Sequence, residues 1–202
     1  MAPNLKSILS SSFVFDVFQS LVGAPAAHRK FLTNYVKPKP GERFLDLGCG
    51  VGATLLHLPE DVHYTGVDIS AAYIKAARAR FGERGTFICS DIAGLSLPSG
   101  HFDHAIAFGV LHHLDTATAQ SLLQVARAAL RPGKCLVTID PCYTPDQSGA
   151  VRFIISKDRG GFVRDVAGYR QLFDPYGEVR VIVVNNLLRF SYTHLIAVTK
   201  FA

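Results

Sequence analysis

Short apolar runs alternate with helical patterns from residue 43 onward. The runs are largely apolar without strict alternation, as in parallel strands that are covered on both faces. The segments between them have apolar residues at helical spacing. This alternation predicts an α/β fold with a mostly parallel, doubly wound sheet and helices on both faces. The five predicted strands are Arg43–Leu47, Val62–Asp68, Thr86–Ser90, Asp103–Phe108 and Cys135–Asp140.

The ends of two helices and of the sheet can also be placed. Ser70 and Asp115 are typical N-cap residues, and each precedes a helical pattern. Near the C-terminus, Glu178–Val184 and Thr193–Thr199 are predicted strands separated only by Asn185–Tyr192. A segment this short cannot contain a crossover helix, so these two strands are expected to pair antiparallel.

Composition restricts the class of protein. The chain has 202 residues, of which 49% are hydrophobic and 18% charged, which is typical of one globular domain. It lacks the run of about 18 apolar residues that a membrane span needs. The net charge of +5 favours an anionic partner but is spread along the chain. Four cysteines without C-x-x-C spacing are expected to be reduced, which predicts a cytoplasmic location and no metal centre.

The segment Phe44–Gly52 combines a strand with a glycine-rich turn. Its three glycines would let a ligand lie against the backbone, and the helix expected next would offer free N–H groups. Asp68 ends the following strand, where an acid can accept hydrogen bonds from both hydroxyls of a ribose. Asp91 ends the third strand at the same edge of the sheet. This order of glycines and acids predicts a nucleoside-type cofactor.

The spacing of the glycines distinguishes two kinds of cofactor. Dinucleotide-binding turns have G-x-G-x-x-G, whereas this chain has G-x-G-x-G with Asp46 two residues before the first glycine. From Arg43 to Thr199 the sequence strongly resembles the class I S-adenosylmethionine-dependent methyltransferases, and most of all the small-molecule enzymes with the first motif L-D-x-G-C-G-x-G. Further segments that carry the resemblance are Gly66–Ser70, Asp91-Ile92, Phe102–Leu114 and Leu130–Lys134.

The resemblance implies a seven-stranded, Rossmann-like sheet of order 3-2-1-4-5-7-6 whose last strand is antiparallel. It implies S-adenosyl-L-methionine as the cofactor and S-adenosyl-L-homocysteine as its product. Asp46, Gly48 and Gly50 would line the methionine part of the cofactor, with Cys49 in the same turn, and Gly52 would permit close helix packing.

The nucleoside part of the cofactor is expected along the next strands. By the same resemblance, Asp68 would hold the ribose and Ile69 would pack on the adenine. Asp91 would accept a hydrogen bond from the adenine amino group, with Ile92 beside the ring. Phe108 would lie under the amino-acid moiety, although plain core packing explains Phe108 and Ile92 equally well.

We expect one methyltransferase domain over residues 1–202. Residues 1–42 are predicted to form two helices that cover the sheet and the active site, the first of them amphipathic within residues 14–22. Residues 43–202 would be the cofactor-binding core, and 141–176 would face the substrate.

Four residues are candidates for the catalytic step. Methyl transfer from a sulfonium needs alignment, exclusion of water and, for some acceptors, removal of a proton. The ends of strands four and five should face the methyl group, which selects His112, His113, Asp140 and Tyr143. His113 is the preferred general base, and a purely loop-ordering role for it stays open. Asp140 precedes Pro141 and could instead cap the following turn.

The nature of the acceptor is left open. Arginines in Val151–Arg170 could hold an anionic acceptor or belong to a solvated helix face, and Gly160-Gly161 would let this segment flex as a lid. Asp140–Tyr143 is similar to the D/N-P-P-Y motif of enzymes that methylate adenine or glutamine amino groups, but it follows the wrong strand and lacks the second proline.

The predicted function is O- or N-methylation of a small molecule, with an anionic acceptor as one option. The alternatives are an RNA or protein methyltransferase and a non-catalytic module that binds the cofactor. Basic residues are not interleaved with aromatic ones, which argues against nucleic acid as the partner. The sequence gives no prediction of the oligomeric state.

Overall fold

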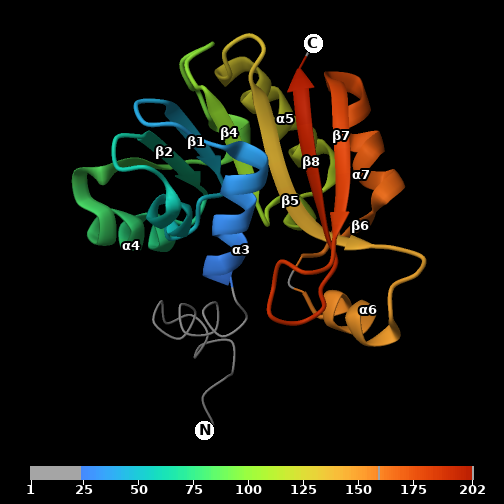
Figure 1. Cartoon of the computed structure of the whole chain (residues 1–202). Coiled ribbons are helices and arrows are strands. Elements are labelled where there is room, and N and C mark those ends of the chain that lie inside the picture. Colours follow the sequence, from blue (N-terminus) through green and yellow to red (C-terminus); the bar gives the residue numbers. More distant parts are fainter. Residues whose placement is uncertain (1–23, 159, 202) are drawn as a thin grey trace, which may run out of the picture.

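The computed structural model describes residues 24–158 and 160–201, which form one twisted sheet with helices on both faces (Figure 1). The strands are β1 (Arg43–Leu47), β2 (His63–Asp68), β3 (Gly85–Cys89), β4 (His104–Phe108), β5 (Cys135–Tyr143), β6 (Arg164–Asp165), β7 (Gly177–Val184) and β8 (His194–Phe201). The α-helices are α3 (Ala24–Phe31), α4 (Ala71–Phe81), α5 (Thr116–Ala129), α6 (Gly149–Ser156) and α7 (Val166–Phe173). Shorter helical turns are η1 (Leu32–Val36), η2 (Ala53–His57), η3 (Gly82–Arg84), η4 (Ile92–Gly94), η5 (Leu111–His113) and η6 (Asp174–Tyr176).

The sheet order is β3-β2-β1-β4-β5-β8-β7, and the two-residue β6 pairs with β5 outside this path. When β6 is left out of the count, this is the expected order 3-2-1-4-5-7-6. The last strand, β8, runs antiparallel to both β5 and β7. The predicted fold class is therefore confirmed, including the closing hairpin.

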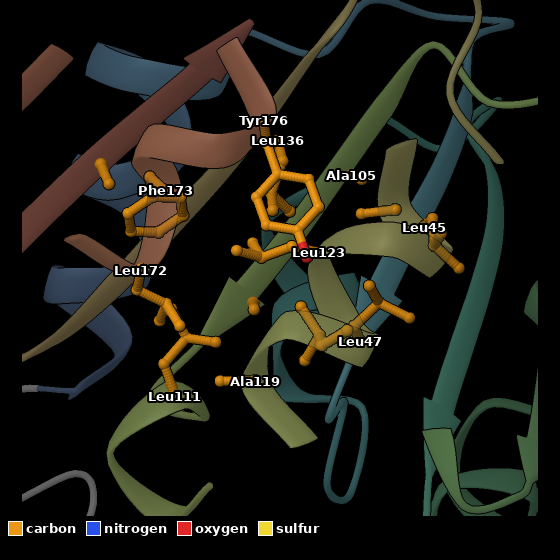
Figure 2. Packing of buried hydrophobic residues seen from close by; sticks show 14 of the residues in the cluster. Leu45, Leu47, Ala105, Leu111, Ala119, Leu123, Leu136, Leu172, Phe173 and Tyr176 are labelled. Atoms are coloured by element: carbon orange, nitrogen blue, oxygen red, sulfur yellow. The ribbon is translucent and has the colours of Figure 1, made fainter. Parts of the chain in front are cut away.

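Two apolar cores lie on opposite faces of the sheet. On one face α5 and α7 pack over β1, β4 and β5, and Figure 2 shows side chains such as Leu123 and Phe173 filling this layer. On the other face α3 and α4 cover a second cluster that includes Phe31 and Ile74. Both cores contain side chains without solvent exposure, so the strands are covered on both faces, as their sequences predict.

The helix starts follow from local chemistry. Ser70 Oγ accepts a hydrogen bond from the N–H of Tyr73, and Asp115 Oδ1 accepts one from the N–H of Thr118. Both residues are therefore N-caps, as expected. The first of the two helices predicted within residues 1–42 lies outside the described residues. The second corresponds to α3 and continues into a short π-helical turn, η1.

The ends of most predicted strands shift by one or two residues, and two elements differ more from the sequence-based expectation. After the glycine turn the chain forms only the five-residue 3-10 helix η2, because Pro59 favours an extended Leu58 and stops the helix. Strand β5 runs three residues further than expected, through Pro141 to Tyr143. The backbone carbonyl of Ile139 accepts a hydrogen bond from Gly109, on the side of β5 that faces β4. The backbone of Pro141, two residues later, faces the same side. Because β4 has already ended there, the N–H that proline lacks leaves no carbonyl of β4 without a partner.

Candidate active site

The glycine turn closes against the segment that follows β4. Gly48 has a φ of 79°, and a Cβ there would overlap the Val110 side chain, so a larger residue would push the two segments apart. The N–H groups of Gly48 and Cys49 both donate to the Val67 carbonyl, which ties the turn to the end of β2. Gly52 follows at positive φ and lies against the Phe81 and Phe87 rings.

Asp46 is a buried carboxylate at this turn. The Tyr64 hydroxyl donates to its Oδ2 at 2.8 Å, whereas Oδ1 is buried without a hydrogen-bond partner among the described residues. Burial raises the pKa of Asp46 to about 6, although the Tyr64 hydrogen bond opposes that shift. An orphaned buried oxygen needs a donor to offset its lost hydration, which a ligand can supply. The residues present therefore fit a cofactor that carries an ammonium group.

Asp68 joins the glycine turn to the start of α4. Its Oδ2 accepts from the N–H of Gly50 at 2.9 Å, and its Oδ1 accepts from the N–H of Ser70 at 2.8 Å. A carboxylate can accept about four hydrogen bonds, so capacity remains for ligand hydroxyls. The neighbouring Ile69 is 69% exposed, which is a high fraction for isoleucine and leaves an apolar surface for a flat ring.

The other predicted cofactor residues lie at the same edge of the sheet. Asp91 is exposed and its Oδ1 caps η4 through the N–H of Ala93, while Ile92 packs partly into the core under α5. Phe108 stacks on His28 of α3 with ring centroids 3.8 Å apart. Helix α3 therefore covers the end of β4. Cys49, the cysteine of the glycine turn, is buried.

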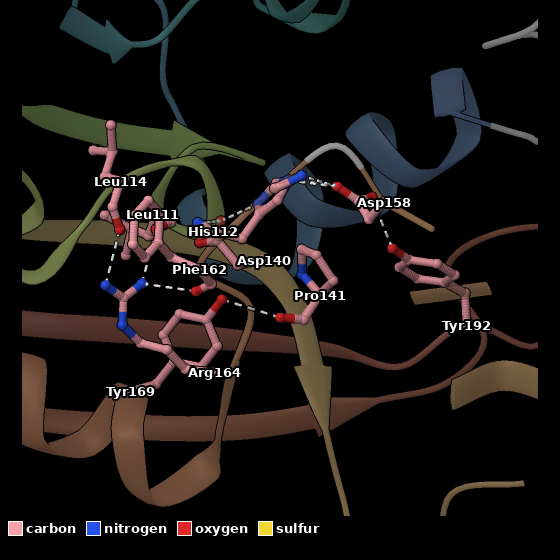
Figure 3. Close-up of polar contacts among 11 residues, drawn as sticks. Leu111, His112, Leu114, Asp140, Pro141, Asp158, Phe162, Arg164, Tyr169 and Tyr192 are labelled. Atoms are coloured by element: carbon pink, nitrogen blue, oxygen red, sulfur yellow. Dashed lines mark hydrogen bonds and ion pairs between the residues drawn. The ribbon is translucent and has the colours of Figure 1, made fainter. Parts of the chain in front are cut away.

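His112 lies between two carboxylates that come from different parts of the chain (Figure 3). Its Nδ1 and its backbone N–H both donate to Asp140 Oδ1, at 2.8 and 3.1 Å. Its Nε2 is 3.2 Å from Asp158 Oδ1, and Asp158 Oδ2 accepts from the Tyr192 hydroxyl at 3.0 Å. The loop after β4, strand β5 and the segment after α6 are thus joined through one imidazole.

The electrostatics of this network keep His112 charged. Burial alone would lower the pKa of His112, but the hydrogen bonds and charges of Asp140 and Asp158 outweigh burial and raise it to about 9. The same pairing lowers the pKa of Asp158, whereas burial raises that of Asp140. A histidine that is protonated at neutral pH cannot accept a proton there, so the structure does not support His112 as a general base.

The segment 160–164 is held against the loop that carries His112. A Cβ at Gly160 would overlap the imidazole, so glycine allows a close approach here, in place of the flexible lid expected from the sequence. The N–H of Phe162 donates to the His112 carbonyl at 2.9 Å. Arg164 donates to the carbonyls of Leu111 and Leu114, both at 2.9 Å. These bonds assign Arg164 to the loop rather than to an anionic acceptor.

The remaining catalytic candidates have different surroundings. Asp140 lies inside β5 and does not cap a turn, because the strand continues past it, and its buried Oδ2 has no hydrogen-bond partner among the described residues. Tyr143 ends β5, and the Arg152 guanidinium lies 4.9 Å from the centroid of its ring. His113 is exposed, and its ring lies 4.0 Å from that of His112.

Three of these side chains could be considered as metal ligands. Ligand atoms of His112, His113 and Asp158 lie within 4.8 Å of one another. However, both ring nitrogens of His112 already face carboxylates, and its raised pKa means that a metal would have to displace a firmly held proton. The cluster is better described as an ion-pair network.

Sequence reasoning missed Asp158 and Tyr192 as members of this network. Asp158 stands 46 positions after His112, and neither Asp158 nor Tyr192 is part of a recognisable motif. The one local signal is the pair Gly160-Gly161, because a glycine beside a polar residue can mark a close backbone approach.

Comparison with known proteins agrees with the fold and with the first motif. Residues 44–133 match the family described as a methyltransferase domain. This match spans less than half of the chain, and together with the sheet order and the glycine turn described above it supports the resemblance to the class I S-adenosylmethionine-dependent methyltransferases. The family resemblance is confirmed, and so is S-adenosylmethionine as the cofactor.

Individual relatives act on different acceptors. The chain is 29% identical over 157 residues to phosphoethanolamine N-methyltransferase 1 of Arabidopsis thaliana, covering 75% of this chain and 32% of that protein. It is 35% identical over 125 residues to an O-methyltransferase of Pyrenophora dematioidea, covering 56% and 46%. The chain thus spans a third to a half of the length of these relatives.

A solved structure shows the same fold. The structure of Haemonchus contortus phosphoethanolamine N-methyltransferase 2 with phosphomonomethylethanolamine and S-adenosylhomocysteine superposes with a TM-score of 0.74. The sequence identity is 13%, and the match covers 98% of this chain and 59% of that one. Within the described residues, every helix is too short or too polar to cross a bilayer.

Proposed function

We propose that this protein transfers the methyl group of S-adenosylmethionine to an oxygen or nitrogen of a small-molecule acceptor. The observation that carries the proposal is Asp46, a fully buried carboxylate beside the glycine turn whose Oδ1 has no hydrogen-bond donor among the residues that the structure describes. Such a group is costly unless a ligand donor meets it, and the cofactor of this family carries an ammonium group. S-adenosylmethionine supplies an already activated methyl group, so the protein's own task is alignment.

Residues at the ends of β1 and β2 are proposed to hold most of the cofactor. Asp46, Gly48 and Gly50 are proposed to hold the amino-acid part, and Asp68 the ribose. Ile69 is proposed to cover one face of the adenine. The hydrogen bonds that Asp68 accepts from the N–H groups of Gly50 and Ser70 hold its carboxylate in one orientation. Little side-chain freedom is therefore lost when the cofactor binds.

Asp91, Ile92, Phe108, Cys49 and Gly52 are proposed to complete the cofactor site. Asp91 and Ile92 would border the adenine from the end of β3. Phe108 is held between α3 and the sheet by its contacts with His28 and Phe31, so it would form a rigid wall under the amino-acid part. Gly52 would keep η2 close to the rings behind it.

The acceptor is proposed to lie beyond β4 and β5, beside His113 and Tyr143. His113 is proposed to take the proton of a hydroxyl acceptor. His112 and Asp140 act as positioning residues, because their ion pair fixes the loop from which His113 projects. Since Arg164 is bonded to backbone carbonyls, the proposal leaves the charge of the acceptor unspecified.

Asp68→Ala is expected to weaken binding of S-adenosylmethionine at least about tenfold. Hydrogen bonds to a charged group contribute about 1.5–3 kcal/mol each, and the ribose assignment gives Asp68 two of them. Isothermal calorimetry measures the effect, and Asp61→Ala, an exposed acid before β2, is the matched control. Equal affinities in the wild type and Asp68→Ala would disprove the ribose assignment.

A further inference from the structure

Helix α6 extends beyond the sheet at the end where the strands carry the candidate site (Figure 1). Its inner face packs through Val151 and Ile155 into a small apolar cluster with Tyr192, separate from the two main cores. Arg152 lies over Tyr143 at the end of β5, so the helix borders the proposed acceptor site. Part of its remaining surface faces solvent.

That outward surface is unusually apolar. Phe153 is 63% exposed and Ile154 is 42% exposed, although they stand on one short helix. Phe162, in the segment that follows, is 46% exposed. Single exposed apolar residues are common, but two adjacent large ones beside a ligand site indicate a surface that meets a partner.

The charged residues within this helix and at its end are all cationic. Arg152 and Lys157 are both exposed, and Gly149–Lys157 contains no acidic residue. Lys157 Nζ lies 5.3 Å from the centroid of the Phe153 ring, so cation and apolar ring share one surface. The next acid, Asp158, is bonded to His112 and Tyr192. The α6 outer face (Arg152, Phe153, Ile154 and Lys157) is therefore cationic and apolar together.

We infer that the α6 outer face docks on an anionic lipid bilayer. A short helix with large apolar side chains and flanking cations lies in the plane of a membrane interface, where the apolar groups enter the acyl boundary and the cations meet lipid phosphates. Its few residues make the binding weak and reversible. If the proposed function holds, docking brings the acceptor site to the membrane surface, which suits an amphiphilic acceptor.

Vesicle co-sedimentation of the full chain tests this inference. Vesicles of phosphatidylcholine with phosphatidylserine are compared with pure phosphatidylcholine. We expect the partition coefficient to rise with phosphatidylserine, and to fall at least about tenfold in Phe153→Ser/Ile154→Ser. Lys157→Gln should lower it about fivefold, the usual contribution of one cation near an anionic surface. The matched control is Tyr73→Ser/Lys75→Gln on α4, which packs beside β3 and exposes both side chains.

Three results would overturn the inference. The first is equal partition onto the two kinds of vesicle. The second is an equal loss in the α4 control. The third is a dimer by ultracentrifugation that becomes monomeric in Phe153→Ser/Ile154→Ser without any vesicle binding, which would assign the face to a second copy of the chain. Thermal melting checks that each variant folds. Calorimetry with S-adenosylmethionine is scored separately, so failure of docking and failure of the proposed function are distinguishable.

Discussion

His113→Ala is expected to lower kcat for a hydroxyl acceptor by about 10²–10⁴-fold, the range typical of a lost general base. His113 ends η5, the turn that follows β4, and is exposed, whereas the neighbouring imidazole of His112 is buried between two carboxylates. Because His112 is protonated at neutral pH, His113 is the member of the pair proposed to accept the proton. The KM for S-adenosylmethionine should change little.

The pH profile of kcat separates this role from loop ordering. The wild-type rate should fall at low pH, where the imidazole is protonated, and the variant should lack that limb. His63→Ala, an exposed histidine at the start of β2, is the control. A loss smaller than about tenfold with an unchanged profile would leave alignment as the whole mechanism and make His113 a loop residue.

Asp140→Ala is expected to lower the free energy of unfolding at pH 7 by about 3–5 kcal/mol, because it leaves a buried imidazolium with one partner fewer. Asp140 Oδ1 accepts from both the side chain and the backbone of His112, so the loop that carries His113 should loosen as well. Asp140→Asn keeps the shape and removes the charge, which separates electrostatics from packing. Urea unfolding measures both variants against Asp61→Ala.

The same ion pair makes stability depend on pH. The folded-state pKa of His112 is raised to about 9, above its unfolded value of about 6.5, so its contribution is complete below the unfolded value. It is lost as the pH rises through about 9, and the loss amounts to about 3 kcal/mol. Asp140→Ala should show a smaller decline over this window. Identical declines in the two proteins would contradict the ion-pair account.

The ends of helices and strands could be predicted from the sequence where they depend on residues close together in the chain. Ser70 and Asp115 cap their helices through bonds to N–H groups three residues away, which a sequence reveals directly. The end of β5 was misplaced because Pro141 has the sequence signature of a turn. Whether a strand tolerates proline depends on where the neighbouring strand ends, and this is a property of the assembled sheet.

The candidate site likewise has a part that could be predicted from the sequence and a part that could not. Asp46 and the three glycines lie within one short motif, so the sequence indicates both cofactor and position. The His112–Asp158 pair joins residues far apart in the chain, and its effect on the pKa of His112 exists only after folding. The number of arginines in Val151–Arg170 did not show which of them are free to bind an acceptor, because the guanidinium of Arg164 donates to backbone carbonyls.

Methyl transfer itself is the most direct test of the account. The purified chain is incubated with S-adenosylmethionine labelled in its methyl group and with a small-molecule extract, a protein fraction or an RNA fraction. We predict that S-adenosylhomocysteine forms and that label enters the small-molecule fraction, and that Asp68→Ala strongly reduces both. Label found only in protein or RNA, or no S-adenosylhomocysteine in any fraction, would contradict the proposal that this chain methylates a small molecule.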